Sequence, residues 1–174
     1  MITVIGTTGA IKNIDVFLQR LLVFSEEETM VIQALDASAV YGKDHLVSAA
    51  MHAMRAFDHQ TNATNSLALE ILLYAAGERQ IHKAIKKIGV KKGEQTIAFV
   101  LIDTVMKKPD DKRMDGVIQK LLQEFHLNLD NTVLEGDKAK LMKLGISVKE
   151  IGTIPKSKYG DLVLEKVALV DVIK

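Results

Sequence analysis

The spacing of hydrophobic and polar positions predicts a mixture of strands and helices along the chain. Runs of β-branched and apolar residues predict strands at residues 2–7, 30–35 and 96–102, and a further short strand at residues 151–154, before Pro155. The run at residues 96–102 is apolar on both faces, a pattern typical of a strand in the middle of a sheet. We therefore expect one small sheet with this segment at its centre.

Apolar residues at helical spacing predict several helices, separated by turns that contain glycine or short polar side chains. Asn13 and Ser66 are suited to cap the starts of two helices, and Gly77 and Gly89 stand where helices should end. A charged loop is expected at residues 107–113. The expected helices cover residues 14–28, 44–59, 67–75, 78–88, 117–125, 137–144 and 158–174.

The order of these elements indicates the fold class. Strands and helices mix irregularly, and no repeat, low-complexity tract or linker divides the chain. This mixture is typical of an α/β or α+β domain in which helices pack against one sheet of about four strands. We expect a single domain over residues 1–174.

Composition excludes several classes of protein. With 48% hydrophobic and 26% charged residues, the 174-residue chain has enough apolar side chains for a core and is not a disordered segment. It contains no cysteine, which excludes disulfides, thiolate nucleophiles and cysteine-ligated metal centres. The first ten residues do not resemble a signal peptide, and no apolar run is long enough for a bilayer. We therefore expect a cytoplasmic protein without a membrane partner.

The sequence contains no obvious catalytic or metal-binding set. The two glycines of residues 6–9 lack the spacing of a dinucleotide loop and the Gly-Lys-Ser/Thr end of a P-loop, so we interpret them as a strand-ending turn. His45, His52 and His59 recur every seven residues, about 10.5 Å apart on a helix, which is too far for one metal ion. We expect boundary histidines, no catalytic residue, no metal and no cofactor.

Charge is concentrated in one segment of a chain whose net charge is only +1. Residues 78–93 contain six basic side chains and one acidic one. The four that would share one face of a continuous helix are Arg79, Lys83, Lys86 and Lys87. The opposite, buried face would hold Ile81, Ala84, Ile85 and Ile88. Two interpretations remain open, a solvated face or a surface for the phosphates of a nucleic acid. Tyr74 and Ile81 flank this face. They would offer stacking or apolar contact to unpaired bases, or alternatively belong to the core.

The C-terminal segment has apolar residues on all sides of its predicted helix, between Leu162 and Ile173. A helix of this kind must be buried on more than one side. Because chain termini usually lie at the surface, a partner protein would cover the outer side. Burial in the protein's own fold, or a strand in place of the helix, is the alternative.

The segment from Asn65 to Val90 resembles the most characteristic part of a known family. It contains Glu-Ile-Leu-x-Tyr at residues 70–74, Gly-x-Arg-x-Ile at residues 77–81 and Ala-Ile-x-x-x-Gly at residues 84–89, followed by a hydrophobic strand. In these motifs the chain resembles the Cgi/TPRKB family, whose members are the small non-catalytic subunit of the KEOPS complex. The preceding helix and the apolar C-terminal helix are also similar to those of the family.

This resemblance implies a compact α/β domain with a mainly antiparallel sheet. It implies two partners, the N-terminal lobe of the atypical KEOPS kinase/ATPase (PRPK-type) and the single-stranded 3′ CCA end of tRNA, and no small-molecule substrate. The protein would help the complex to place threonylcarbamoyl on the adenosine next to the anticodon, while another subunit performs the chemistry.

The resemblance also assigns residues to these two partners. The tRNA candidates are Tyr74, Gly77, Arg79, Gln80, Ile81, Lys83, Lys86 and Lys87, with Asn65 and Glu70 in second place. The kinase candidates are Leu164, Val167, Leu169 and Val170, followed by Met51 and Met54. Two other functions stay open: a protein–protein module that regulates a kinase without binding RNA, and a small hydrolase with a catalytic set that is dispersed in the sequence.

Overall fold

The computed structural model describes residues 1–105 and 108–173. Its strands are β1 (Ile2–Ile11), β2 (Met30–Asp36), β3 (Gly93–Asp103) and β4 (Asn128–Leu129). Its α-helices are α1 (Ile14–Glu27), α2 (Gly42–Asp58), α3 (Leu67–Ala76), α4 (Ile81–Ile88), α5 (Asp111–Glu124), α6 (Lys138–Lys143), α7 (Val148–Ile151) and α8 (Tyr159–Val172). Lys107 of the predicted loop and Lys174 of the predicted last helix lie outside the described residues.

The four strands form one antiparallel sheet in the order β2-β3-β1-β4. β3 lies between β2 and β1 and is buried on both faces. Ile97, Phe99 and Leu101 belong to the buried cluster on one face of the sheet, and the residues between them belong to the cluster on the other. The predictions of an α+β fold, a four-stranded antiparallel sheet and a central strand at residues 96–102 are therefore confirmed.

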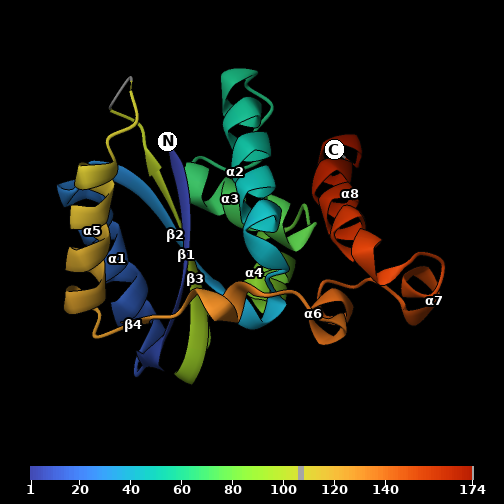
Figure 1. The fold of residues 1–174 in the computed structure, drawn as a ribbon. Helices are drawn as coiled ribbons and strands as arrows, with labels where there is room; N and C mark the ends of the chain where they lie inside the picture. Colours follow the sequence, from blue (N-terminus) through green and yellow to red (C-terminus); the bar gives the residue numbers. More distant parts are fainter. Residues whose placement is uncertain (106–107, 174) are drawn as a thin grey trace.

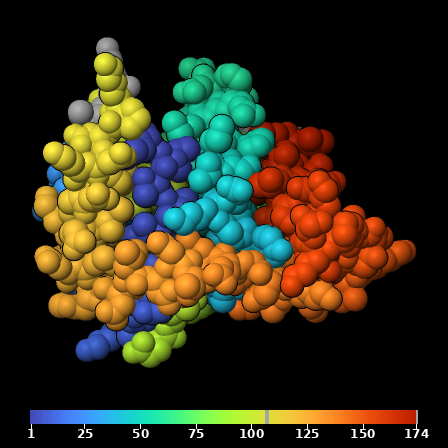
Figure 2. Space-filling model, in the orientation of Figure 1, coloured from blue at the N-terminus to red at the C-terminus, as the bar shows by residue number. Residues whose placement is uncertain are grey.

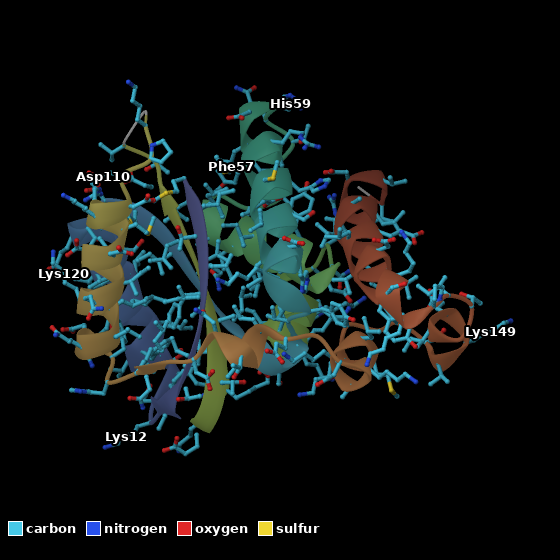
Figure 3. All side chains as sticks on the ribbon, in the orientation of Figure 1. Lys12, Phe57, His59, Asp110, Lys120 and Lys149 are labelled. Carbon is cyan, nitrogen blue, oxygen red and sulfur yellow. The ribbon has the colours of Figure 1, made fainter. Side chains whose placement is uncertain are left out.

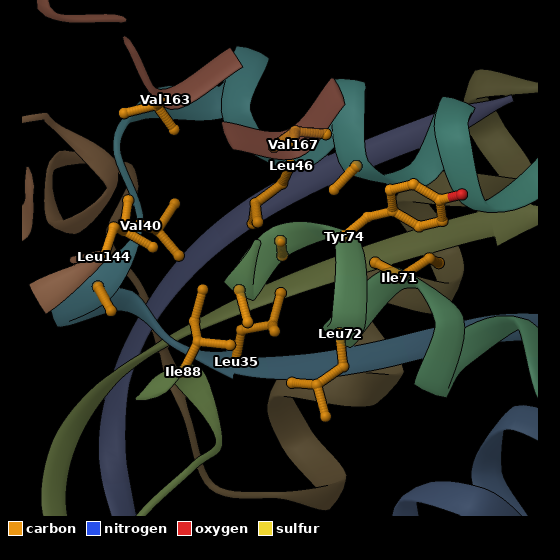
Figure 4. Packing of buried hydrophobic residues seen from close by; sticks show 14 of the residues in the cluster. Leu35, Val40, Leu46, Ile71, Leu72, Tyr74, Ile88, Leu144, Val163 and Val167 are labelled. Atoms are coloured by element: carbon orange, nitrogen blue, oxygen red, sulfur yellow. The ribbon is translucent and has the colours of Figure 1, made fainter. Parts of the chain in front are cut away.

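Helices cover both faces of this sheet (Figure 1). α1 and α5 pack on one face through side chains such as Phe17 and Leu121. α2, α3 and α4 cover the other face, where Leu46, Ile71 and Ile88 are fully buried (Figure 4). α8 packs against α2 and α3 rather than against the sheet, so it forms an outer layer whose far side faces solvent.

The predicted strand at residues 151–154 is wrong. Ile151 ends the short helix α7, which begins with a capping box between Ser147 and Glu150. The fourth strand is instead β4, which pairs over only two residues with Thr7 and Thr8 of β1. Because both of its residues are exposed, β4 has no alternation of buried and exposed positions by which it could have been found.

β1 continues to Ile11, past the glycines that we interpreted as a strand-ending turn. A Cβ at Gly6 would lie 2.6 Å from the carbonyl oxygen of Asp130, and one at Gly9 would lie 2.4 Å from Cδ2 of Leu127. These glycines therefore let the segment before and after β4 lie close against an uninterrupted strand. The turn interpretation is corrected accordingly.

The three regularly spaced histidines occupy three different environments. His45 is buried: it accepts the N–H of Tyr41 at Nδ1 and donates from Nε2 to the carbonyl of Ala75, at 3.1 and 2.8 Å. His52 is half-buried, and His59 is exposed at the end of α2 (Figure 3). The expectation of a boundary position is thus wrong for His45, whose burial lowers its pKa to about 4.

This buried histidine makes stability depend on pH in a defined interval. In the unfolded chain the pKa of His45 is about 6.5. The unfolded state therefore binds a proton between pH 6.5 and 4 that the folded state does not, so stability falls as the pH falls. We expect His45 to lower the free energy of unfolding by about 2 kcal/mol between pH 7.5 and pH 5.

Urea unfolding at the two pH values checks this effect. His45→Gln should be less stable than the wild type at pH 7.5, but should lose about 2 kcal/mol less on going to pH 5. The exposed His59→Gln variant should follow the wild type at both pH values. Equal pH-dependent losses in the wild type and His45→Gln would contradict the prediction.

Candidate functional site

A short connection separates α3 from α4 and carries several of the predicted tRNA residues. Gly77 has a φ of 64° and ends α3, and the N–H of Glu78 donates to the carbonyl of Leu73 at 3.0 Å. Residues 78–80 therefore lie outside any helix, and α4 begins only at Ile81. The predicted helix over residues 78–88 is wrong in its first turn, because a left-handed glycine stops the preceding helix there.

Two cations of the predicted basic face are held by groups of the protein itself. Nζ of Lys87 donates to Oε1 of Glu78 at 2.5 Å and to the carbonyl of Ala76 at 3.1 Å, and its side chain is only 18% exposed. Nη1 of Arg79 donates to the carbonyl of Val170 at 3.4 Å. The structure thus corrects the prediction that Lys87 is free for a phosphate, whereas Arg79 is half-buried.

The rest of this segment faces solvent. Its exposed side chains are Gln80, Ile81, His82, Lys83, Ile85 and Lys86. No ion pair between described residues involves Lys83 or Lys86. Ile81 and Ile85 are 39% and 48% exposed, so the predicted buried face is reduced to Ala84 and Ile88. The α3–α4 segment, residues 77–86, therefore presents cations next to apolar side chains.

Tyr74 lies in the core and connects α3 with α2 and α8. Its hydroxyl donates to Oδ1 of Asp171, whose Oδ2 accepts the Nδ1–H of His52 at 2.8 Å. The rings of Tyr74 and His52 lie 5.5 Å apart, and burial together with the bond to Asp171 raises the pKa of Tyr74. With no exposed surface, Tyr74 is not available to stack on a base, which corrects that prediction (Figure 4). Its role here is to fix the last turn of α8.

The buried side of α8 is a narrow stripe of valines. Val163, Val167 and Val170 are at most 2% exposed and pack into the core. The prediction that Val167 and Val170 contact a partner is therefore corrected, because their side chains are covered by α2 and α3. Leu164 is half-buried and Leu169 is 44% exposed.

Part of the outer side of α8 joins α2 in one surface. Met51 of α2 and Leu164 of α8 line a shallow cavity of about 270 Å³ between the two helices. Ala168 and Val172 follow Leu164 at helical spacing and are exposed, Val172 to 75%. We call these four residues the α2/α8 surface; Figure 2 shows the two helices side by side.

Two other candidates lie outside this surface. Met54 is partly buried against the core and contributes little exposed area. Leu169 follows Lys166, which lies beside Gly77, and by helical spacing it belongs to the opposite flank of α8. The structure therefore brings Met51 and Leu164 together and separates them from Leu169.

Sequence reasoning did not single out Asp171, Ala168 or Val172. Asp171 interrupts an apolar run, which was the available signal for a residue with a specific partner. Within residues 1–105 and 108–173, no group of three or more histidine or carboxylate side chains is arranged to hold a metal ion. In the same part of the chain, no helix combines the length and apolar character needed to cross a bilayer.

Comparison with known proteins gives two matches. The sequence profile described as kinase binding protein CGI-121 matches residues 10–171. A protein of Methanocaldococcus jannaschii named Regulatory protein Cgi121 is 29% identical over 144 residues, which cover 82% of this chain and 84% of the relative. Both matches include α2 and the α3–α4 segment. The profile also includes most of α8.

Proposed function

This chain belongs to the CGI-121 family of kinase-binding proteins, and from that membership we propose that it is a non-catalytic adaptor of the KEOPS complex. In this proposal the α2/α8 surface binds the kinase/ATPase subunit. The α3–α4 segment binds the 3′ CCA end of tRNA and presents the tRNA for threonylcarbamoyl modification next to the anticodon. The supporting observation is that two unlike surfaces, one apolar and one cationic, lie on different elements of one chain.

The apolar surface supports the kinase half of the proposal. Met51 and Val172 are 51% and 75% exposed. Because an exposed patch of large apolar side chains usually marks an interaction site, we assign the α2/α8 surface to the kinase. Asp171 holds the turn that carries Val172 against α2 and α3, so the surface is ordered before a partner arrives.

The α3–α4 segment supports the tRNA half. Lys83 and Lys86 offer charge to phosphates, and Gln80 and Ile81 offer a polar and an apolar contact for an unpaired base. Arg79 stands at the edge of the segment, where its guanidinium can bridge phosphates or stack. Of the predicted residues, Tyr74 and Lys87 support this surface from within.

A charge-reversal variant tests the tRNA half. Lys83→Glu combined with Lys86→Glu should weaken tRNA binding about tenfold at moderate salt, because phosphate contacts are lost and repulsion is added. Both side chains are exposed, so the thermal unfolding temperature should not change. Lys43→Glu combined with Lys149→Glu makes the same charge change elsewhere on the surface and should bind tRNA as the wild type does.

The measurement is a titration with tRNA that has, or lacks, its CCA end. We expect the wild type to prefer the complete tRNA, and the Lys83/Lys86 variant to lose that preference. Equal, weak binding of both tRNAs by the wild type would refute the tRNA half. It would favour the second candidate, a protein module that regulates a kinase without binding RNA, in which the cations are only solvated.

We further propose that residues 1–174 act as one domain, in the cytoplasm. The buried cluster on one face of the sheet contains residues from Val4 to Val170, so the first strand and the last helix share a core.

A further inference from the structure

The strand β2 has one edge that is not paired with another strand of the sheet. It is the last strand of the sheet, and within the described residues only β3 pairs with it. Asp103 of β3 lies opposite Met30 of β2. The N–H of Asp103 points away from β2 and donates to the carbonyl of Met1, on the β1 side. Met30 and Asp103 therefore form a non-hydrogen-bonded pair of the antiparallel ladder. The backbone groups of Met30 therefore face outward, and those of Ile32 and Ala34 do the same by alternation.

Two side-chain bonds agree with this direction. The hydroxyl of Ser25 donates to the carbonyl of Met30 at 2.5 Å, and Nε2 of Gln33 donates to the carbonyl of Ala34 at 2.8 Å. Between these two carbonyls, the N–H and C=O of Ile32 face the same edge, on which no strand pairs with β2. A strand edge of this kind is a template for pairing with another chain.

A groove lies beside β2 and is lined by residues of β2 itself and of helices from both faces of the sheet. α1 forms one wall, with Leu18 and Leu22 exposed to 42% and 60%. α3 and the end of α4 form the other wall, which includes Leu69 and Ile85, the latter 48% exposed. The space between the walls measures about 570 Å³ and has a predominantly apolar lining. We call it the β2-edge groove.

The shape of this groove restricts what can occupy it. In a second copy of the chain, β2 would be recessed between the same two walls, so two such edges would be held apart by their helices. A single extended segment fits, because its backbone can reach Ile32 while successive side chains point to the α1 wall and to the α3–α4 wall. The residues that line the groove include no cation, and the nearby Lys91 serves only one end, which suits a single acidic side chain better than a series of phosphates.

We propose that the β2-edge groove binds an extended peptide segment of another protein, which adds a strand to the sheet beside β2. The segment carries apolar side chains that alternate between the two walls. An acidic residue is expected at one end, because Nζ of Lys91 bonds the carbonyl of Gly89, which lines that end of the groove. This binding depends neither on the kinase nor on tRNA.

The test is a selection from a random peptide library displayed on phage, with the full-length protein as bait. Peptides are selected on the wild type and counter-selected on Leu18→Asp combined with Leu22→Asp, two changes at exposed positions of the α1 wall, outside the α3–α4 segment. We expect enriched peptides with alternate apolar residues that bind the wild type at least about tenfold more tightly than this variant. Methylation of the backbone nitrogen that faces Ile32 should weaken them by a similar factor, because it removes the donor for strand pairing.

The matched control is Val16→Asp combined with Val23→Asp. Both valines are about half exposed on α1 but lie outside the groove, so this variant should bind the selected peptides as the wild type does. Absence of any peptide that distinguishes the wild type from the groove variant would overturn the proposal. So would peptides that are insensitive to backbone methylation.

Two further outcomes would assign the groove to other occupants and also overturn the proposal. One is an oligonucleotide ending in CCA that binds the wild type but not the groove variant, in the absence of selected peptides. The other is a dimer of the wild type that the groove substitutions dissociate, measured by analytical ultracentrifugation.

Discussion

Replacement of Met51 and Ala168 together by aspartate is expected to weaken kinase binding at least about 100-fold while the fold stays intact. Both side chains are exposed, on α2 and α8 respectively, so neither change places a charge in the core. In the complex, however, two carboxylates would replace apolar side chains of the contact and lose much of their hydration, which is costly. The loss should appear as a faster dissociation rate.

The measurement is surface plasmon resonance with the kinase/ATPase subunit that we propose as the partner, from the same organism, together with thermal unfolding of each variant. Val148→Asp is the control, because Val148 is 68% exposed on α7, away from the α2/α8 surface. Its binding should equal that of the wild type. A folded Met51/Ala168 variant that still co-purifies with the kinase would show that the interface lies elsewhere.

A charge at Val167 would not test this interface. From the sequence, Val167 is a reasonable partner residue, because the C-terminal segment is apolar on all sides. In the structure Val167 is 1% exposed and lies on the buried side of α8. Val167→Glu would therefore detach this helix from α2 and α3. Loss of binding by that variant would report unfolding of α8.

The elements that the sequence predicts well are those whose burial pattern is local. β3 is apolar on both faces, and α1 and α3 begin at side chains, Asn13 and Ser66, that accept the expected N–H groups. β4 has no such signal, because it exists only where the chain passes the two close glycines of β1. Its pairing is a product of tertiary contact.

The sequence indicates where the cations cluster along the chain, but not how their side chains are oriented. The cluster of cations at residues 78–93 is visible in the sequence, but the inward direction of Lys87 depends on Gly77 ending α3 and on Glu78 lying beside it. In α8 the hydrophobic pattern does not distinguish faces, and only contact with α2 and α3 selects the valines. The β2-edge groove is formed by elements far apart in sequence.

Glu70 is a further residue whose role changes between sequence and structure. The family resemblance makes it a candidate for RNA contact, yet it is 1% exposed and its carboxylate faces inward. Oε2 accepts the N–H groups of Ala63 and Thr64, at 3.1 and 2.9 Å, and the hydroxyl of Thr64 lies 2.9 Å away. One carboxylate thus organises the loop that leads from α2 to α3.

Glu70→Ala is therefore expected to lower the free energy of unfolding by about 3 kcal/mol, because it leaves the N–H groups of Ala63 and the buried Thr64 without their acceptor. For a chain of this length the unfolding temperature should fall by about 10 °C. Asp44→Ala removes a carboxylate from the first turn of α2, but Asp44 is exposed, so that control should cost less than about 1 kcal/mol. Calorimetry that finds equal stability in the two variants would contradict the structural role of Glu70. Because α3 leads directly into the α3–α4 segment, the same variant should bind tRNA less well only at temperatures where α3 has begun to unfold.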